Sequence, residues 1–321
     1  MHAHIERKGL MDIDLVYLWV DDKDPTWIEK KKRYLIDSDK YDIDAVDECR
    51  FYNNDELKYS LRSVEKNAPW VNKIYIVTDN QIPEWLNTDN PKIKIVDHSE
   101  IIPQDKLPIF NSCAIETRIP YIEGLSEYFL YANDDMFFWQ PVEKDFFFEN
   151  NKFIWRISRF MRKYKKPKRL YGTTLLRAYN LIKTKFNPDF YVFYPYHNID
   201  IYKKSDFFEC INEFQEEFDE TLKHRFRQFD DVQRIIVSFY SLIKKRSVLR
   251  NVHRHFLHKL LNLHSDSFVL NLKKKNVNKL KKINAKLVCI NDSAKATNED
   301  RIKVKEFLNK KFSEKSSFEK E

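Results

Sequence analysis

The sequence predicts an α/β fold with a mostly parallel sheet and added helices in the C-terminal half. Two observations lead to this prediction. Over the first 150 residues, short apolar runs rich in β-branched and aromatic residues alternate with segments of helical spacing, which is the pattern of strands and helices around a parallel sheet. Hydrophobic residues make up 42% of the chain and aromatic residues 15%, enough to cover such a sheet with a dense core.

Five apolar runs predict the strands. Each is short, is rich in β-branched or aromatic residues and is followed by polar residues. Runs that are apolar throughout are typical of buried strands. The predicted strands cover residues 13–20, 73–78, 92–96, 128–132 and 286–290.

The predicted helices follow from caps and apolar spacing. The first begins at Pro25, because proline is favoured in the first helical turn and Asp24 can cap it. Asn54 or Asp55 is predicted to cap a second helix, which ends before Pro69. Apolar residues at helical spacing predict further helices over residues 173–186, 207–222, 232–245 and 298–312.

The net charge changes sign near residue 150, and this change is the one candidate domain boundary in the sequence. Residues 1–150 carry a net charge of −12 and the remainder a net charge of +20. One interpretation is an acidic, metal-binding α/β part over residues 11–150 and a helical, basic part over 151–321 that holds anions, the two together forming one domain. Solvated surfaces of opposite charge would explain the same counts, and charge alone does not decide between the two interpretations.

Composition excludes several classes of protein. Only three glycines are present, so neither a Gly-rich phosphate loop nor a dinucleotide-binding fingerprint can be formed. The four cysteines lie far apart in the sequence, which fits a reducing compartment. The absence of a membrane-spanning apolar run or a signal-peptide core predicts a cytoplasmic protein. The sequence has no nucleic-acid-binding motif.

Two acidic clusters follow predicted strands. Asn133, Asp134 and Asp135 come directly after the strand over 128–132. Because carboxylate oxygens at a strand end are suitable ligands for Mg²⁺ or Mn²⁺, this cluster is a candidate metal site, although a capped turn would have the same sequence. Asp21 and Asp24 follow the first strand. They are candidates for contacting a ribose, a base or a metal-bound water, and the helix cap is the slightly favoured alternative.

Histidine and arginine provide the other candidate groups. His197 lies in an aromatic, proline-containing segment over 194–198 and is a candidate general base, with a structural role as the commoner alternative. Arg177, Arg225 and Arg227 would match phosphate oxygens with their planar forks, or would form surface ion pairs. The basic stretch over 244–282, which contains His253, His255 and His258, would suit an anionic polymer, the inner face of a membrane or plain solvent.

Together these motifs resemble the Stealth family of capsular polysaccharide phosphotransferases, which shares its catalytic core with the human GlcNAc-1-phosphotransferase. The first similar block is IDLVYLWVDDKD and the longest begins RFYNNDELKYSLRSVEKNAPWVNKIYIVTDN. The remaining blocks include GLSEYFLYANDDMFF, YPYHNID and RFRQFDDVQ. The resembling segments cover residues 13–24, 50–87, 107–116, 124–138, 194–200, 225–233, 288–293 and 316–319.

The resemblance implies a fold and a reaction. The fold would be a Rossmann-like nucleotide-sugar-transferase core. The enzyme would transfer hexose-1-phosphate from a UDP-hexose donor to a hydroxyl of a polysaccharide acceptor, forming a phosphodiester and releasing UMP. Mg²⁺ or Mn²⁺ would be the cofactor, and the enzyme would contact the inner membrane or the capsule-assembly machinery peripherally. A glycosyltransferase that attacks the sugar carbon and a non-catalytic polyanion-binding protein are the alternatives.

The resemblance also implies residue roles. Asp134, Asp135 and Asp292 would hold the metal, His197 would be the general base and Asp24 would be catalytic. The substrate-binding residues would be Arg177, Arg227, Asp21, Asn133 and Arg62. Asp231 matches an acidic position without an assigned role. Asp22 stands where the family often has glycine, and Cys113 where many members have histidine, which puts any catalytic role of position 113 in doubt.

Overall fold

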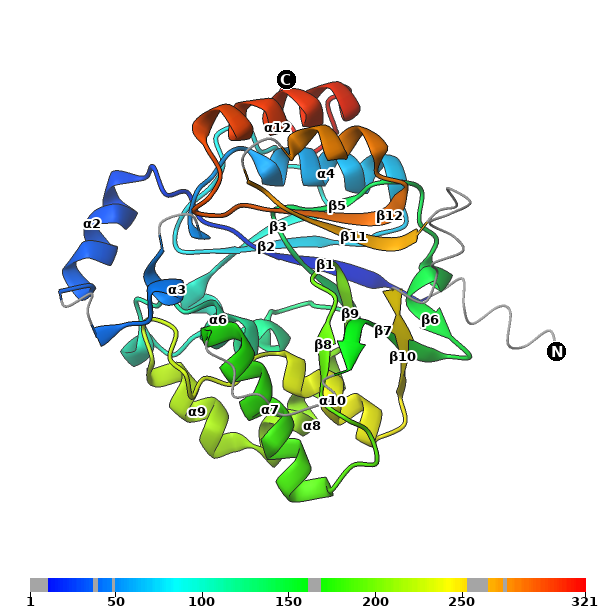
Figure 1. Ribbon diagram of the computed structural model, residues 1–321. Helices are drawn as coiled ribbons and strands as arrows, with labels where there is room; N and C mark the ends of the chain where they lie inside the picture. Colours follow the sequence, from blue (N-terminus) through cyan, green and yellow to red (C-terminus); the bar gives the residue numbers. More distant parts are fainter. Residues whose placement is uncertain (1–10, 37–39, 48–49, 161–168, 253–264, 274–275) are drawn as a thin grey trace.

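The central sheet has five strands, and four of them are parallel. The structure is a computed structural model, which describes residues 11–36, 40–47, 50–160, 169–252, 265–273 and 276–321. The strand order is β3-β2-β1-β4-β9, with only β9 antiparallel (Figure 1). The parallel part has the order of a doubly wound, Rossmann-like sheet, as predicted. The strands are β1 (Ile13–Leu18), β2 (Ile74–Thr78), β3 (Ile93–Asp97), β4 (Tyr128–Asn133) and β9 (Asp200–Lys203).

Each face of this sheet has its own hydrophobic core. Successive side chains of a strand point to opposite faces. On β1, Val16 packs into one core, whereas Leu15 and Tyr17 pack into the other. All five residues of β2 are buried. Burial on both faces explains why these strands are apolar throughout.

Two smaller sheets flank the central one. The first has the order β10-β7-β6, with β8 paired to β7, and the second has the order β11-β12-β5. Because β9 joins β4 and β12 joins β5, strands from both sides of residue 150 share sheets. The bounds are β5 (Met136–Phe138), β6 (Phe148–Glu149), β7 (Lys152–Phe160), β8 (Phe193–Pro195), β10 (Ser247–Asn251), β11 (Ser265–Asn271) and β12 (Ala285–Asn291).

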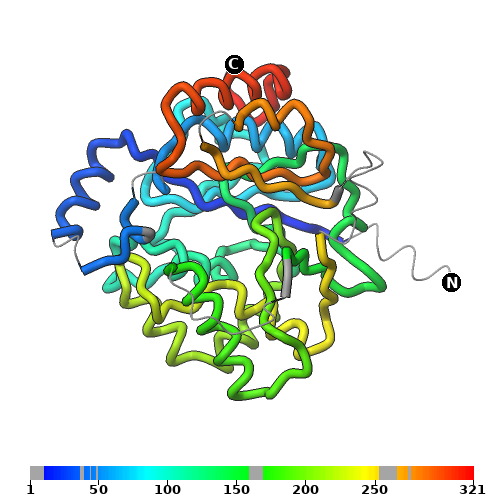
Figure 2. The backbone as a smooth tube through the Cα atoms, viewed as in Figure 1, coloured from blue at the N-terminus to red at the C-terminus, as the bar shows by residue number. Residues whose placement is uncertain are grey.

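Helices cover both faces of the central sheet (Figures 1 and 2). One face is covered by α4 (Glu56–Asn67), with α12 (Asn298–Lys311) beside it. The opposite face is covered by α6 (Ser112–Arg118), α7 (Leu170–Phe186), α8 (Lys204–Glu213), α9 (Gln215–Lys223) and α10 (Ile235–Ile243). The remaining elements are α2 (Pro25–Tyr34), α3 (Ile43–Val46), α5 (His98–Ile101) and 3₁₀ turns at Gln104–Lys106, Ile119–Tyr121, Lys144–Phe147 and Val277–Lys282. Among the residues that the structure describes, no helix is both long and apolar enough to span a bilayer.

The structure confirms the five predicted strands and corrects two helix predictions. The helix predicted over 207–222 is two helices, because Phe214 leaves the helical conformation and its N–H bonds back to the carbonyls of Cys210 and Ile211. Asp55 does precede α4, but its backbone is left-handed and its carboxylate pairs with Lys305 instead of capping the helix. His253, His255 and His258 lie outside the described residues.

Candidate active site

The acidic centre of the site is the turn between β4 and β5. Asp134 and Asp135 occupy this turn at the carboxyl edge of the parallel sheet. Burial raises the pKa of Asp135 to about 6. Burial, together with the charges of Glu56 and Asp135, raises the pKa of Asp134 well above its ordinary value. Asp135 Oδ1 is buried and has no hydrogen-bond partner among the described residues. The turn therefore gathers carboxyl groups whose charged forms are disfavoured by burial.

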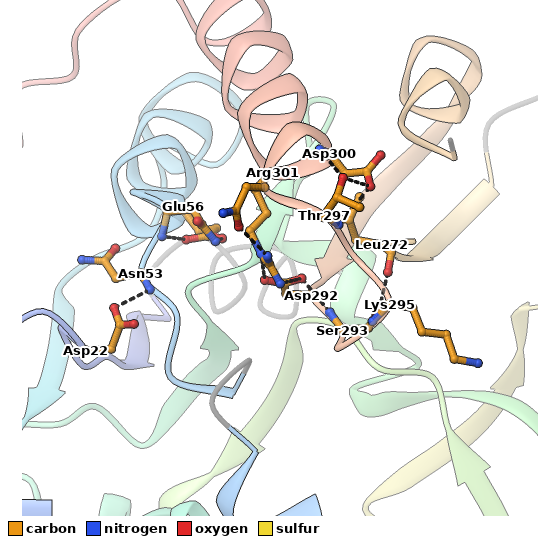
Figure 3. Close-up of polar contacts among 12 residues, drawn as sticks. Asp22, Asn53, Glu56, Leu272, Asp292, Ser293, Lys295, Thr297, Asp300 and Arg301 are labelled. Carbon is orange, nitrogen blue, oxygen red and sulfur yellow. Dashed lines mark hydrogen bonds and ion pairs between the residues drawn. The ribbon is translucent and has the colours of Figure 1, made fainter. Parts of the chain in front are cut away.

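Glu56 joins this centre and was missed by the sequence analysis. It is the first residue of α4, and burial raises its pKa to about 7. Its carboxylate accepts hydrogen bonds from the backbone N–H and side-chain amide of Asn54, at 2.7 and 2.8 Å (Figure 3). The signal that could have identified it is its position at a helix start, within the polar segment that precedes the helix.

Asp292 lies near the centre but already has a cationic partner. It follows β12, and its charge adds to the factors that raise the pKa of Asp135. Arg301 of α12 donates to both of its carboxylate oxygens, at 2.7 and 3.3 Å. Figure 3 shows this ion pair facing Glu56, and all three residues line one pocket. Arg301 thus occupies one acceptor position on each oxygen of Asp292, and metal ligation by Asp292 stays a prediction.

His197 meets the acidic centre from the other side. It lies between β8 and β9, and one ring nitrogen is within 4.8 Å of both an Asp135 oxygen and Cys289 Sγ. Burial is the main cause that lowers the pKa of His197 to about 4, and the charges of Arg234, Arg227 and Arg50 contribute to the same shift. The imidazole is therefore neutral at neutral pH. The same arginines show that a positive region adjoins the acidic centre.

The arginines of this region belong to different elements. Arg227 donates a hydrogen bond to Ser112 Oγ at the start of α6. Arg234, at the start of α10, forms an ion pair with Glu116 at 3.1 Å and lies over the ring of Tyr131. Arg234 was not singled out from the sequence. Arg177 lies on α7, and its Nε is buried without a hydrogen-bond partner within the described part of the chain.

Arg225 and Asp231 have structural roles next to this region. Arg225 donates to the Pro108 carbonyl at 2.6 Å. Asp231 is fully buried and accepts hydrogen bonds from the Asn111 side chain at 2.8 Å and the Gln228 N–H at 2.8 Å. Its other oxygen lies 2.7 Å from His224 Nδ1. These bonds fix the loop that carries Arg227.

The loop after β1 is held by a glutamine. Gln81 accepts a hydrogen bond from the Asp21 N–H at 2.9 Å and donates to the Asp21 carbonyl and to Asp24 Oδ2. Asp24 Oδ1 accepts from the Thr26 N–H, which confirms the predicted cap of α2. The bond from Gln81 is the first cause of the lowered pKa of Asp24. Asp24 therefore shapes this loop with both of its oxygens.

Asn133 and Arg62 have partners within the chain. Asn133 Oδ1 accepts a hydrogen bond from the Tyr131 hydroxyl at 2.8 Å, next to the acidic turn. Arg62 is buried, and its Nε and Nη2 each donate to Glu319 at 2.7 Å. Its Nη1 donates to the Phe312 carbonyl at 2.7 Å. All three nitrogens of Arg62 thus fasten α4 to the C-terminal segment, and the expected role in substrate binding is not carried forward.

Comparison with known proteins gives the family. The family model "Stealth protein CR1, conserved region 1" matches residues 11–39, and "Stealth protein CR2, conserved region 2" matches residues 50–155. The capsular polysaccharide phosphotransferase fcs1 of Haemophilus influenzae is 38% identical over 299 residues, which are 89% of this chain and 79% of that protein. The chain belongs to the Stealth family. The prediction of an enzyme of this phosphotransferase family is confirmed.

Other relatives extend the comparison. The capsular polysaccharide phosphotransferase SacB of Neisseria meningitidis serogroup A is 36% identical over 331 residues. That match covers 96% of this chain and 57% of SacB, so the chain spans little more than half of that relative. Among solved structures, the galactosyltransferase LgtC aligns over 94% of this chain and 95% of its own, with a TM-score of 0.44 and 11% identity.

Proposed function

We propose that this Stealth protein transfers hexose-1-phosphate from a UDP-hexose to a hydroxyl of a growing capsular polysaccharide, forming a phosphodiester and releasing UMP. The observation that carries the proposal is the position of His197 between a carboxylate centre and an arginine region. Transfer at phosphorus requires neutralisation of two phosphates and a base near the acceptor hydroxyl. The site provides groups of each type at one edge of the sheet.

The carboxylate centre fits a hard divalent cation. Its oxygen ligands would come from Asp134, Asp135 and Glu56, whose pKa values are raised first by burial and then by neighbouring carboxylates. The unpartnered Oδ1 of Asp135 is a vacant acceptor of the kind that a metal ion satisfies. When bound there, Mg²⁺ or Mn²⁺ would neutralise charge on the donor diphosphate and on the departing UMP.

The arginines would hold the phosphates of the donor. Arg227, Arg234 and Arg50 all act electrostatically on His197, so an anion next to the imidazole would experience their attraction together. Guanidinium groups suit this task because their planar forks match phosphate oxygens. Arg177 would add to the set through its unpartnered Nε.

His197 would take the proton of the acceptor hydroxyl. A pKa of about 4 makes its imidazole neutral and able to accept a proton, but a weak base. A bound diphosphate would offset the arginine charges that lower this pKa. Donor binding would therefore raise the pKa of His197 toward neutral pH. This would make the imidazole a stronger base in the donor complex, in which it acts.

The excess of positive charge after residue 150 would favour the anionic polymer product. It would equally favour peripheral contact with an anionic membrane surface. Co-sedimentation with vesicles tests that contact: binding to anionic but not neutral vesicles is expected, and no binding to either would remove the membrane from the proposal.

The experiment that tests the reaction is the identification of the released nucleotide. The protein is incubated with UDP-hexoses, Mg²⁺ and a capsule acceptor. UMP and a phosphodiester ³¹P signal in the product are the expected results. UDP without a phosphodiester would show attack at the sugar carbon and replace the proposal with a glycosyltransferase.

A further inference from the structure

Asp135, His197 and Cys289 form a second kind of metal-ligand set inside the site. One oxygen, one nitrogen and one sulfur from these side chains lie within 4.8 Å of one another. Cys289 Sγ donates a hydrogen bond to Asp135 Oδ2 at 3.4 Å. Cys289 is fully buried, whereas Asp135 and His197 keep some contact with solvent. The set is therefore closed on the sulfur side and accessible on the other.

Three elements hold these side chains in place. Cys289 lies on β12, where it pairs with Met136, the residue after Asp135. The segment of His197 is fixed by the Tyr196 N–H, which donates to the Arg156 carbonyl at 2.8 Å. The Tyr196 hydroxyl accepts from the Val269 N–H on β11, the neighbour of β12. A common framework thus sets the spacing of the three ligands.

The chemistry of this set differs from that of the carboxylate centre. Mg²⁺ prefers oxygen ligands, whereas thiolate and imidazole select Zn²⁺, Co²⁺ and related ions. A tetrahedral zinc site has metal–ligand bonds of about 2.0–2.3 Å, so its ligand atoms lie about 3.3–3.8 Å apart. The three side chains need to close by only about 1 Å to reach that geometry. The unpartnered Oδ1 of Asp135 independently indicates that this carboxylate lacks a ligand.

We propose that Asp135, His197 and Cys289 form a binding site for a thiophilic divalent cation, with Zn²⁺ as its representative. Binding would release the Cys289 thiol proton to solvent and form the metal–sulfur bond. The ion would occupy the lone pair of the general base and one carboxylate of the magnesium site. Zn²⁺ would therefore act as an inhibitor of transfer. This inhibitory consequence rests on the proposed function, whereas binding of the ion does not.

Cobalt titration tests the site without any donor or acceptor. Chelator-treated protein is given one equivalent of Co²⁺, and the absorption spectrum is recorded. We expect a thiolate-to-cobalt charge-transfer band and the intense visible bands of four-coordinate cobalt, both removed by one equivalent of Zn²⁺. Absence of the charge-transfer band in the wild-type protein would overturn the proposal. This part of the test uses the wild-type protein alone, so it does not depend on whether a variant folds.

Matched variants identify the ligands. Cys289→Ser is expected to remove the charge-transfer band, while Cys210→Ser, at a buried cysteine on α8, keeps it. His197→Gln should weaken Co²⁺ binding at least about 10-fold, and His224→Gln, in a separate cluster, should leave it unchanged. A band that survives Cys289→Ser would overturn the assignment. Since no transfer is measured, failure of the phosphotransferase proposal would not alter these outcomes.

Discussion

Two acidic clusters follow neighbouring strands of the same sheet, and they differ in how the chain treats their charge. After β1, the loop of Asp21 and Asp24 is bonded by Gln81 and by backbone N–H groups. After β4, Asp134 and Asp135 lie beside a third carboxylate, and one oxygen of Asp135 has no hydrogen-bond partner in the described part of the molecule. The pKa of Asp24 is lowered, whereas the pKa of Asp135 is raised.

The difference separates a structural cluster from a candidate catalytic one. Carboxylates bonded by their own chain are stabilised in the charged form and need no ligand. Carboxylates that are buried beside one another are costly in their charged form unless a cation binds. We infer that the first cluster shapes the loop and that the second binds the metal. The following predictions test this division, from the largest expected effect to the smallest.

The largest effect is expected from His197→Ala, which removes the base beside the second cluster. Turnover should fall about 10²–10⁴-fold, the range for losing a general base. The measurement is kcat and KM for UMP release, with His98→Ala, at a buried histidine of α5, as the control. A change confined to KM for the acceptor would assign His197 to binding instead.

Asp135→Asn should lower turnover about 10²–10³-fold, because a ligand that positions transition-state charge stabilisation is lost. Asp21→Asn is the matched control, since an amide oxygen can still accept the bonds from the Lys23 N–H and the Asn53 side chain. We expect it to retain activity within about 10-fold, because no group that stabilises transition-state charge is lost. Equal losses of turnover in the two variants would contradict the division into a structural cluster and a metal-binding cluster.

Metal binding should stabilise the protein in a pH-dependent way. The pKa values of Glu56 and Asp135, about 7 and about 6, exceed their ordinary values of 4.5 and 3.8. Without metal, at pH values between the ordinary and the raised pKa of each group, the folded protein therefore binds more protons than the unfolded chain. The free energy of unfolding falls as the pH rises through this range, up to about 7. Mg²⁺ should raise Tm by a few degrees at about pH 8 and much less at about pH 5, where the carboxylates are protonated.

Thermal unfolding with and without Mg²⁺ provides this measurement, and Asp135→Asn should remove most of the shift. Equal shifts at both pH values would contradict metal binding at these carboxylates.

EDTA should abolish transfer and added Mg²⁺ or Mn²⁺ should restore it.

The smallest effect is expected from Asp24→Ala, which removes the cap of α2 and the bond from Gln81. The free energy of unfolding should fall by about 1 kcal/mol, as for other capping residues, while kcat changes much less than in Asp135→Asn. Urea unfolding and the transfer assay measure the two effects. A loss of kcat without a loss of stability would restore the catalytic role that the sequence suggested for Asp24.

The sequence predicted those parts of the fold that local pattern determines. The strands β1, β2 and β4 are largely buried on both faces, so their apolar runs identify them as strands without knowledge of their partners. By contrast, β5 has three residues, and its strand character depends on pairing with β12. Phe214 leaves the helical conformation within a continuous helical pattern, a local change that the apolar spacing does not encode.

The same distinction applies to the candidate site. Asp134, Asp135 and His197 were predicted from motifs, and the structure brings them together. Glu56 and Cys289 were missed because each is an isolated residue until α4 and β12 pack against the acidic turn. The ion pair of Arg62 was also not predicted, since its partner Glu319 lies 257 residues away in the chain.

The pairing of β5 with β12 has a consequence for biosynthesis. Cys289 and Asp135 are separated by 154 residues, so their contact is highly non-local and is expected to form late in folding. During translation, the acidic turn leaves the ribosome long before β12, and domains are completed only when their last strands are available. The nascent chain thus carries its carboxylate cluster without the strand that completes the site while a further 154 residues are synthesised, and the proposed metal-dependent activity should appear only after release of the segment that contains β12.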